Sequence, residues 1–422
     1  MTPSRHVLIT GLGIVCPWGI GKEALWSQWQ AGRGGIRRIT QFDPTGLPVE
    51  YGGEVPDFEP KEHVRPRKSL KVMSREIQFA FTAADLAMRD ARLRVGTFPP
   101  ERLGVVFGAD MIYCDAWELI EPIQACMPTG KFEFNRWATE GLPRIMPLWL
   151  LKYLPNMPAS HVAIANDARG PCNSIILNDV SGLTALAEGV RLIERNLVDL
   201  VIVGGVGARL HPTTITFRVE QYLARGTDDP ATVCRPFGLQ RAGQALGEGA
   251  GALILESAEH AAARQATSYG RVAGYALRHE PRRAGQPPRG IAVAAALRAC
   301  LEAARIDPAE LSHVNCQGLG TEPHDQAEAD VLARTVGRVP VCALKGAWGN
   351  IGAGSGPLEL AASLLAQQTG VLPPNINTRP RDPACPVWSD AAEPIPLERR
   401  AFVKYNFSMT GQAAAVCVQT EG

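Results

Sequence analysis

Short apolar runs that do not alternate with polar residues constrain the fold of this chain more than any other feature. They occupy residues 6–15, 102–110, 173–179, 198–208, 250–257, 271–277, 312–318, 339–346, 401–409 and 413–419. Strands that are apolar on both faces belong to sheets covered on both sides by helices. The pattern therefore predicts an α/β protein built in layers.

Four longer segments between these runs have the i, i+3, i+4, i+7 spacing of an amphipathic or nearly buried helix. They are residues 77–93, 182–196, 292–306 and 358–370. Both parts of the chain show the same alternation of predicted strands and helices, and each contains a strand that leads into a special turn. We predict two similar α/β halves, 1–256 and 257–422, with a cap insertion on the first at about 111–160, which is richer in Pro, Trp and Met.

The composition is that of an ordinary globular protein and argues against several classes of partner. Hydrophobic residues make up 45% of the 422, and the formal net charge is +1. No basic stretch carries interleaved aromatic residues, so there is no electrostatic case for nucleic acid or an anionic membrane as the main partner. No apolar stretch reaches the ~18 residues of a membrane span, and the first apolar run is interpreted as a strand rather than a signal peptide.

The cysteines and glycines give no sign of a metal or a dinucleotide. The ten cysteines include no C-x-x-C pair and no Cys/His zinc spacing, so no metal site is expected. Scattered cysteines inside apolar runs, such as Cys342 and Cys417, fit a reduced, cytoplasmic setting. The glycines at 11 and 13 do not form a dinucleotide fingerprint, because Cys16 stands where its third glycine would be.

The stretch from Gly170 to Leu186, "GPCNSIILNDVSGLTAL", has the outline of a strand, a sharp turn and a helix. A turn of this kind usually presents a nucleophile, but here it carries Asn178 and Asp179. The nearest sulfur, in Cys172, lies several residues too early.

Eight segments, in this order along the chain, resemble an elongating β-ketoacyl-acyl carrier protein synthase of the thiolase superfamily. They are VLITGLGIVCPWG, AGRGGIRRITQFDPTGLPVEYGGEVPDFEP, GPCNSIILNDVSG, DLVIVGGVGA, CRPFGLQRAGQALGEGAGALILE, GLGTEPHDQAEADVL, LKGAWGNIGAGSGPLELA and LPPNINTRPRDP. The resemblance extends from about His6 to Gln419. It implies a thiolase-like, five-layered αβαβα fold with two similar halves.

In this family a cysteine at a helix N-terminus takes up an acyl chain as a thioester, and two histidines assist malonyl decarboxylation. All three are replaced here. The family's T-x-C-[AS]-S turn places Asp179 at the cysteine, H-G-T-x-T places Gln317 at the first histidine, and K-x-x-x-G-H places Asn350 at the second. Lys345 of the last motif is retained.

The resemblance also implies which residues surround the pocket. Of two threonines that hold the pantetheine arm of a carrier protein, Thr321 remains and Leu319 replaces the other. The aromatic gate, G-F-G-G, becomes residues 408–411, so Phe407, Met409 and Gly411 are expected near the substrate. The family scaffold is otherwise kept: Gly318, Gly349 and Gly411 should form tight turns, and the acidic residues Glu248, Asp325 and Glu328 are expected to be structural.

Two hypotheses follow for the function. In the first, the chain cannot condense alone and resembles the chain length factors that pair with an active ketosynthase. Asp179 would then cap the buried helix. In the second, the chain is a repurposed enzyme for dehydration, isomerisation or hydrolysis of acyl thioesters. An Asp179 with a raised pKa would be its acid or base, and Gln317 and Asn350 would donate hydrogen bonds to the thioester oxygen.

The resemblance implies an acyl carrier protein as substrate carrier, no cofactor beyond its pantetheine arm, and a homodimer or a heterodimer with an active ketosynthase. A local basic patch at Arg37–Arg38 or residues 63–71 is either a site for an acidic partner or a solvated face. Cys172 and Cys316 are interpreted as core thiols, and His324 as a surface residue.

Overall fold

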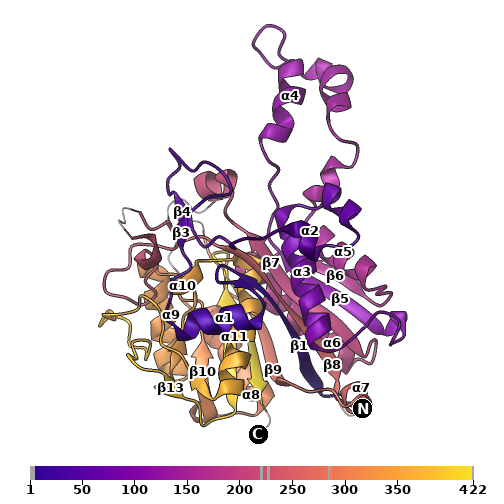
Figure 1. Ribbon diagram of the computed structural model, residues 1–422. Helices are drawn as coiled ribbons and strands as arrows, with labels where there is room; N and C mark the ends of the chain where they lie inside the picture. Colours follow the sequence, from indigo (N-terminus) through magenta and orange to yellow (C-terminus); the bar gives the residue numbers. More distant parts are fainter. Residues whose placement is uncertain (1–4, 219–221, 226–228, 284–285, 287, 421–422) are drawn as a thin grey trace.

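The computed structural model describes residues 5–218, 222–225, 229–283, 286 and 288–420. One large mixed sheet passes through the whole molecule in the order β11-β10-β14-β15-β9-β1-β8-β7-β5-β6, with β2 attached to β1 (Figure 1). Its strands are β1 (Val7–Cys16), β2 (Gly19–Ile20), β5 (Leu103–Ala109), β6 (Cys172–Ile175), β7 (Leu200–Ala208), β8 (Glu248–Ser257), β9 (Gly270–His279), β10 (Leu311–Asn315), β11 (Val341–Cys342), β14 (Ala401–Phe407) and β15 (Gln412–Gln419). Two small ribbons pair β3 (Arg37–Arg38) with β4 (Tyr51–Gly52), and β12 (Val371–Leu372) with β13 (Ile395–Pro396).

The helices cover the sheet in layers. They are α1 (Lys22–Gln30), α2 (Pro60–His63), α3 (Arg75–Asp90), α4 (Trp117–Ala125), α5 (Met157–Ala165), α6 (Ser181–Glu194), α7 (Ala258–Ala263), α8 (Ile291–Ala304), α9 (Glu322–Thr335), α10 (Lys345–Trp348) and α11 (Ser355–Thr369). Helices α3 and α5 pack on the first half of the sheet, and α8 packs on the second half and against α9. Helices α6 and α11 pack against each other and against strands of both halves, so they form the central layer.

This arrangement follows the sequence patterns closely. Each of the ten apolar runs contains a strand, and each of the four helical segments contains a helix, so both predictions are confirmed. β8 is buried along its whole length and α11 almost so, which explains why neither shows a polar face. The run 173–179 is strand only as far as Ile175 and then turns.

The two halves of the sheet meet at a narrow junction. Strand β1 pairs with β9 only through Leu8 with Arg271 and Ile9 with Gly270. On one side of this junction β5, β6 and β7 run parallel, and on the other β10, β11 and β14 do. In open parallel sheets, ligand sites form beyond the carboxyl ends of such strands.

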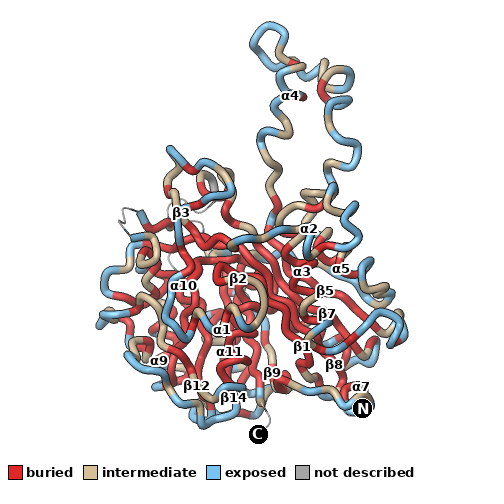
Figure 2. Tube along the Cα trace, in the orientation of Figure 1, coloured by how far each residue is buried: buried red, intermediate tan, exposed pale blue. Residues whose placement is uncertain are grey.

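The predicted insertion forms an arm, residues 111–156, that leaves the body after β5 and returns before α5. Figure 1 shows it projecting away from the sheet with α4 near its far end, so it does not cover the first half as a cap would. The burial map in Figure 2 shows the sheet and central helices buried, whereas the arm is mostly intermediate or exposed. No helix among the described residues is long and apolar enough to cross a membrane.

Close approach of β1 to α3 depends on a glycine. A Cβ atom on Gly13 would lie 1.8 Å from the backbone oxygen of Ala83, which cannot move without displacing the helix. We expect Gly13→Ala to lower the free energy of unfolding by at least about 3 kcal/mol in urea titrations. Gly32→Asn is the control, because Gly32 has φ 63 in open space, where asparagine is tolerated. Equal losses in the two variants would contradict the packing argument.

Candidate functional site

The turn at the cysteine position is built by local hydrogen bonds. After β6 the backbone turns sharply at Asn178, which has φ 55, and a short 3-10 turn, Asn178–Val180, leads into α6. Ser181 Oγ accepts the N–H of Leu177 at 2.7 Å and donates to the carbonyl of Asn178 at 2.6 Å. This arrangement directs Asp179 inward, and only 6% of that residue is exposed.

The carboxylate of Asp179 is an ion-pair partner rather than a helix cap. Arg209 donates to both of its oxygens, Nη1 to Oδ1 and Nη2 to Oδ2, each at 3.3 Å. Gln317 Nε2 donates to Oδ1, also at 3.3 Å. No side-chain capping bond forms at the start of α6 or of the preceding turn in the described structure, so the capping interpretation is wrong.

The pKa of Asp179 is lowered, which contradicts the expected raised pKa of an acid or base. Burial by itself would raise this pKa, but the charge of Arg209, a hydrogen bond from the Asn350 amide and the charge of Lys345 outweigh it. The carboxylate is therefore ionised at neutral pH. The expected raised pKa did not take into account the guanidinium of Arg209, which lies opposite the Asp179 carboxylate.

Arg209 and Asp110 are site residues that the sequence reasoning missed. Arg209 Nε donates to Asp110 Oδ2 at 2.8 Å and Nη2 to Asp110 Oδ1 at 3.3 Å, so one guanidinium binds two carboxylates. Asp110 directly follows β5 and Arg209 directly follows β7, and both are buried. A charged residue at the carboxyl end of a fully apolar strand is a signal that could have found them.

Two carboxylates shape the loop that carries Gln317. Glu328 accepts the backbone N–H groups of Gln317 and Gly318 at 2.7 and 2.9 Å, and Asp325 accepts those of Leu319 and Gly320 at 3.0 and 3.1 Å. Because these bonds serve the backbone, they support the structural role expected for both residues.

The amides of Gln317 and Asn350 are already satisfied by protein groups. Asn406 donates to the Gln317 side-chain oxygen, while Asn350 Nδ2 donates to Gln244 Oε1 at 3.0 Å and Asn350 Oδ1 accepts the N–H of Gly352 at 3.0 Å. Gln317 is fully buried and Asn350 is 2% exposed. A substrate oxygen would have to displace these partners.

Lys345 belongs to a second buried charge cluster next to the first. Its Nζ donates to Glu359 Oε1 at 2.7 Å. Lys404 donates to the other oxygen of Glu359 and to the carbonyl of Cys316, the latter at 3.0 Å. All three charged side chains are essentially unexposed, so Glu359 neutralises one lysine and leaves one positive charge.

Glu248 lies apart from these clusters, at the start of β8. It accepts two hydrogen bonds from Arg75 and one from the N–H of Val55 at 2.9 Å. It thereby holds the beginning of α3 and the segment before it against the sheet, consistent with a structural role.

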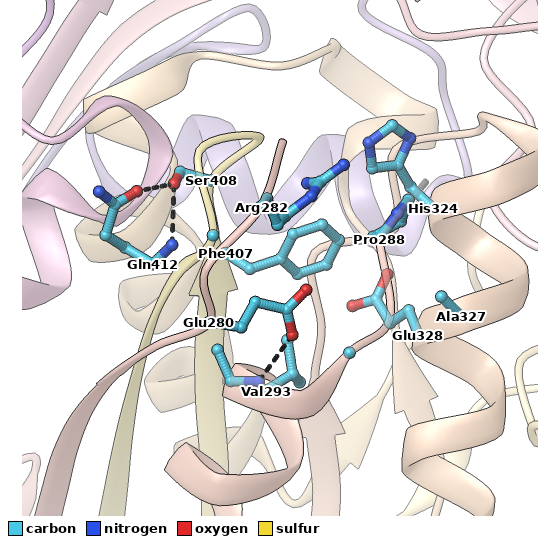
Figure 3. Close-up of a pocket in the computed structure, with 13 residues that line it drawn as sticks. Glu280, Arg282, Pro288, Val293, His324, Ala327, Glu328, Phe407, Ser408 and Gln412 are labelled. Atoms are coloured by element: carbon cyan, nitrogen blue, oxygen red, sulfur yellow. Dashed lines mark hydrogen bonds between the residues drawn. The ribbon is translucent and has the colours of Figure 1, made fainter. Parts of the chain in front are cut away.

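Two of the four residues expected to bind substrate, Phe407 and Gly411, line a small, separate cavity (Figure 3). In this view the Phe407 ring lies in the middle of the labelled lining residues, with Arg282 and His324 on one side and Glu280 on the other. Gly411 also lines it and Met409 packs next to the core beside it. The tight turns expected at Gly318, Gly349 and Gly411 are confirmed by their φ values of 50, 78 and 98.

Thr321 does not line this cavity but is bound to His324, which does. Thr321 Oγ1 lies 2.8 Å from His324 Nδ1, so the hydroxyl expected to hold pantetheine is bound to the protein itself. His324 is 1% exposed and packs between the rings of Tyr222 and Phe407, so the surface interpretation is wrong. Burial, followed by the charge of Arg282, lowers the pKa of His324 to about 4.

The cysteines near the site are not reactive groups of the cluster. Cys316 is fully buried, and burial raises its pKa, so the core-thiol prediction is confirmed. Cys172 is exposed at the beginning of the edge strand β6, so that prediction is wrong. In the described part of the chain no three His, Cys, Asp or Glu side chains gather as a metal site requires.

The chain matches two family models, the N-terminal domain of β-ketoacyl synthase over residues 4–261 and its C-terminal domain over residues 269–379. It is 32% identical to the ketoacyl synthase beta subunit of the tetracenomycin polyketide synthase of Streptomyces glaucescens over 387 residues, which is 90% of this chain and 89% of that protein. It is also 32% identical to the alpha subunit of that synthase over 388 residues, with the same coverage.

Solved structures show the same fold. The ishigamide ketosynthase/chain length factor superimposes with a TM-score of 0.85 at 27% identity, covering 99% of this chain and 100% of that one. A type II polyketide acyl-carrier protein in complex with its ketosynthase gives a TM-score of 0.86 at 25% identity, with the same coverage. The predicted thiolase-like α/β fold is therefore confirmed.

The ion pair predicts a large and specific loss on truncation of Asp179. We expect Asp179→Ala to reduce the free energy of unfolding by about 3–5 kcal/mol, because it leaves a buried guanidinium short of one counter-charge. Sodium formate should restore part of the loss, since formate fits the vacated carboxylate position, whereas chloride at equal ionic strength should not.

The pH dependence of the folding stability tests the same ion pair. Because the folded-state pKa of Asp179 is lowered, its stabilisation is fully present above the unfolded pKa and is lost only as the pH falls through the folded value. The difference between the parent and Asp179→Ala should therefore be constant from pH 6 to 8. A loss of only about 1 kcal/mol without formate rescue would instead indicate a simple helix cap.

Proposed function

This chain belongs to the β-ketoacyl synthase family, and we propose that it is a non-condensing subunit of type II fatty acid or polyketide synthesis that pairs with an active ketosynthase. Its effect would be that of a chain length factor: the partner forms the carbon–carbon bonds, and this chain influences the length of the product. The observation that carries the proposal is the ion pair of Asp179 with Arg209 at the position of the nucleophile.

The cluster of Asp179, Gln317 and Asn350 contains no group suited to the condensation reaction. Thioester formation needs a nucleophile, and a carboxylate held by two guanidinium nitrogens is a poor one. Proton transfer at neutral pH needs a group with a pKa near 7, and neither Gln317 nor Asn350 titrates. The lowered pKa of Asp179 argues against the acid or base that the repurposed-enzyme hypothesis requires.

The surface supports pairing with a second subunit. Ten of the eighteen exposed large hydrophobic side chains of the described residues lie on the arm: Met111, Trp117, Ile120, Ile123, Phe132, Phe134, Leu142, Met146, Leu148 and Leu150. Strand β6, which follows the arm, is the edge of the sheet, and Ile176 and Leu177 beyond it are also exposed. Exposed apolar side chains and an open sheet edge are both typical of subunit interfaces.

The partner and the carrier follow from relatives whose names state them. The tetracenomycin relatives are named as alpha and beta subunits of one synthase, and one structural neighbour is a complex with an acyl-carrier protein. We propose an active ketosynthase as partner, an acyl carrier protein as the donor of chains to the pair, and no cofactor other than its pantetheine arm.

Activity assays separate the proposal from the enzyme hypothesis. The pure chain should leave acyl-, 3-hydroxyacyl- and malonyl-carrier proteins unchanged in intact-mass measurements. Addition to a ketosynthase with an intact Cys-His-His set from the same organism should shift the chain length of the product. Turnover by the chain alone that is lost in Asp179→Asn would contradict the proposal, as would a product distribution unchanged by a stable complex.

Substitutions on the arm test the interface. Ile120→Asp should weaken association with the ketosynthase by roughly tenfold to a hundredfold, because the new carboxylate is buried without a partner when the subunits join. Ile291→Asp on α8 is the matched control, since Ile291 is exposed to nearly the same extent, 52% against 50%, but lies in the other half. Equal affinities of the two variants in sedimentation experiments would place the interface elsewhere.

A further inference from the structure

Three charged side chains stand at the carboxyl ends of adjacent parallel strands, where a substrate cavity would open. Asp110 follows β5, Asp179 lies in the turn after β6, and Arg209 follows β7. These strands are neighbours in the sheet, so their ends converge. The three side chains are buried, with exposed fractions of 5%, 9% and 7% respectively.

The guanidinium is held rigidly by its neighbours. Its three nitrogens make four hydrogen bonds to four carboxylate oxygens, at 2.8 to 3.3 Å. Such paired, forked contacts fix both the position and the plane of an arginine. The Arg209 side chain therefore cannot leave without breaking bonds to Asp110 and Asp179 together.

The surrounding backbone is shaped to accommodate this group. A Cβ atom on Gly352, which has φ 66, would lie 2.0 Å from Asp110 Oδ2 and 2.3 Å from Arg209 Nε. A Cβ atom on Gly207 would lie 3.1 Å from the same Asp110 oxygen. The ion pair thus packs against bare backbone and occupies the space that these glycines leave.

From these observations we infer that Arg209, held by Asp110 and Asp179, closes this chain's own acyl cavity. An apolar acyl chain that reached Asp179 would have to displace a buried, paired charge and would offer it no hydrogen bonds in return. Arg209 is in this sense a residue that determines specificity, and it excludes acyl groups. The inference rests on the proposed function in one respect: length control by this chain must then act at the subunit interface rather than in its own pocket.

The test introduces a thiol at position 179 and compares its reactivity in the presence and in the absence of Arg209. In Asp179→Cys alone, the introduced thiol should remain inaccessible to octanoyl-coenzyme A. In Asp179→Cys/Arg209→Ala/Asp110→Ala, the thiolate should attack the thioester carbonyl, form the new S–C bond and release coenzyme A, which takes up the proton. Octanoylation at position 179, located by peptide mapping, should be faster by about a hundredfold or more, the factor set by displacing a paired guanidinium.

Controls keep the test decisive. The parent chain reports octanoylation of its own exposed cysteine, Cys172, and methyl methanethiosulfonate measures access of a small reagent to position 179. If the triple variant does not fold, Asp179→Cys/Arg209→Ser/Asp110→Asn replaces it, because its polar side chains keep partners for the buried groups.

Equal octanoylation of Asp179→Cys with and without Arg209 would overturn the inference. So would an opened variant that takes the small reagent but not the octanoyl group. Because the readout is a mass change on the isolated chain, it is independent of product length, and either proposal can fail without the other.

Discussion

Compensation of buried charge is the constraint on which the region between the two halves of the sheet depends. Glu359 accepts from both Lys345 and Lys404, so that cluster keeps one positive charge. Arg209 binds both Asp110 and Asp179, so that cluster keeps one negative charge. The charge of Lys345 contributes to the lowered pKa of Asp179, so the two clusters interact favourably. Asp179 contributes to this compensation of charge, which is a structural role for its carboxylate.

The same constraint explains why the three family positions differ together. An anion at residue 179 needs hydrogen-bond donors: the amide of Gln317 donates to it, and the amide of Asn350 helps to lower its pKa, without either group carrying charge or titrating. Their remaining polar atoms are bound by Asn406, Gln244 and the backbone. The replacements therefore belong to one buried polar network, in which Gln244 Nε2 and Asn406 Oδ1 are left without a hydrogen-bond partner among the described residues.

Patterns local to the sequence predicted most of the fold. Apolar runs gave the strands, helical spacing gave α3, α6, α8 and α11, and glycines marked the turns at 318, 349 and 411. The resemblance also located the positions that meet at the site. The other seven helices of the described residues were not predicted: α1, α2, α7 and α10 are short, α4 and α5 lie in or beside the insertion, and α9 carries charges on much of its surface.

What the sequence could not supply were relations between distant residues. The sign of the pKa shift of Asp179 depends on Arg209, thirty residues away and on another strand. The exposure of Cys172 depends on the position of β6 at the edge of the sheet. The order of strands in a sheet cannot be predicted from the sequence of a single strand. His324 follows a loop like a surface residue, but two aromatic rings from other segments enclose it.

The arm has a consequence for the chain before it meets any partner. Its aromatic and aliphatic side chains project from the body on a segment with few buried residues of its own. Exposed apolar surface of this kind promotes self-association at the concentrations reached during synthesis. If the proposed partner subunit covers the arm, the amount of this chain that stays in solution would depend on the supply of that subunit.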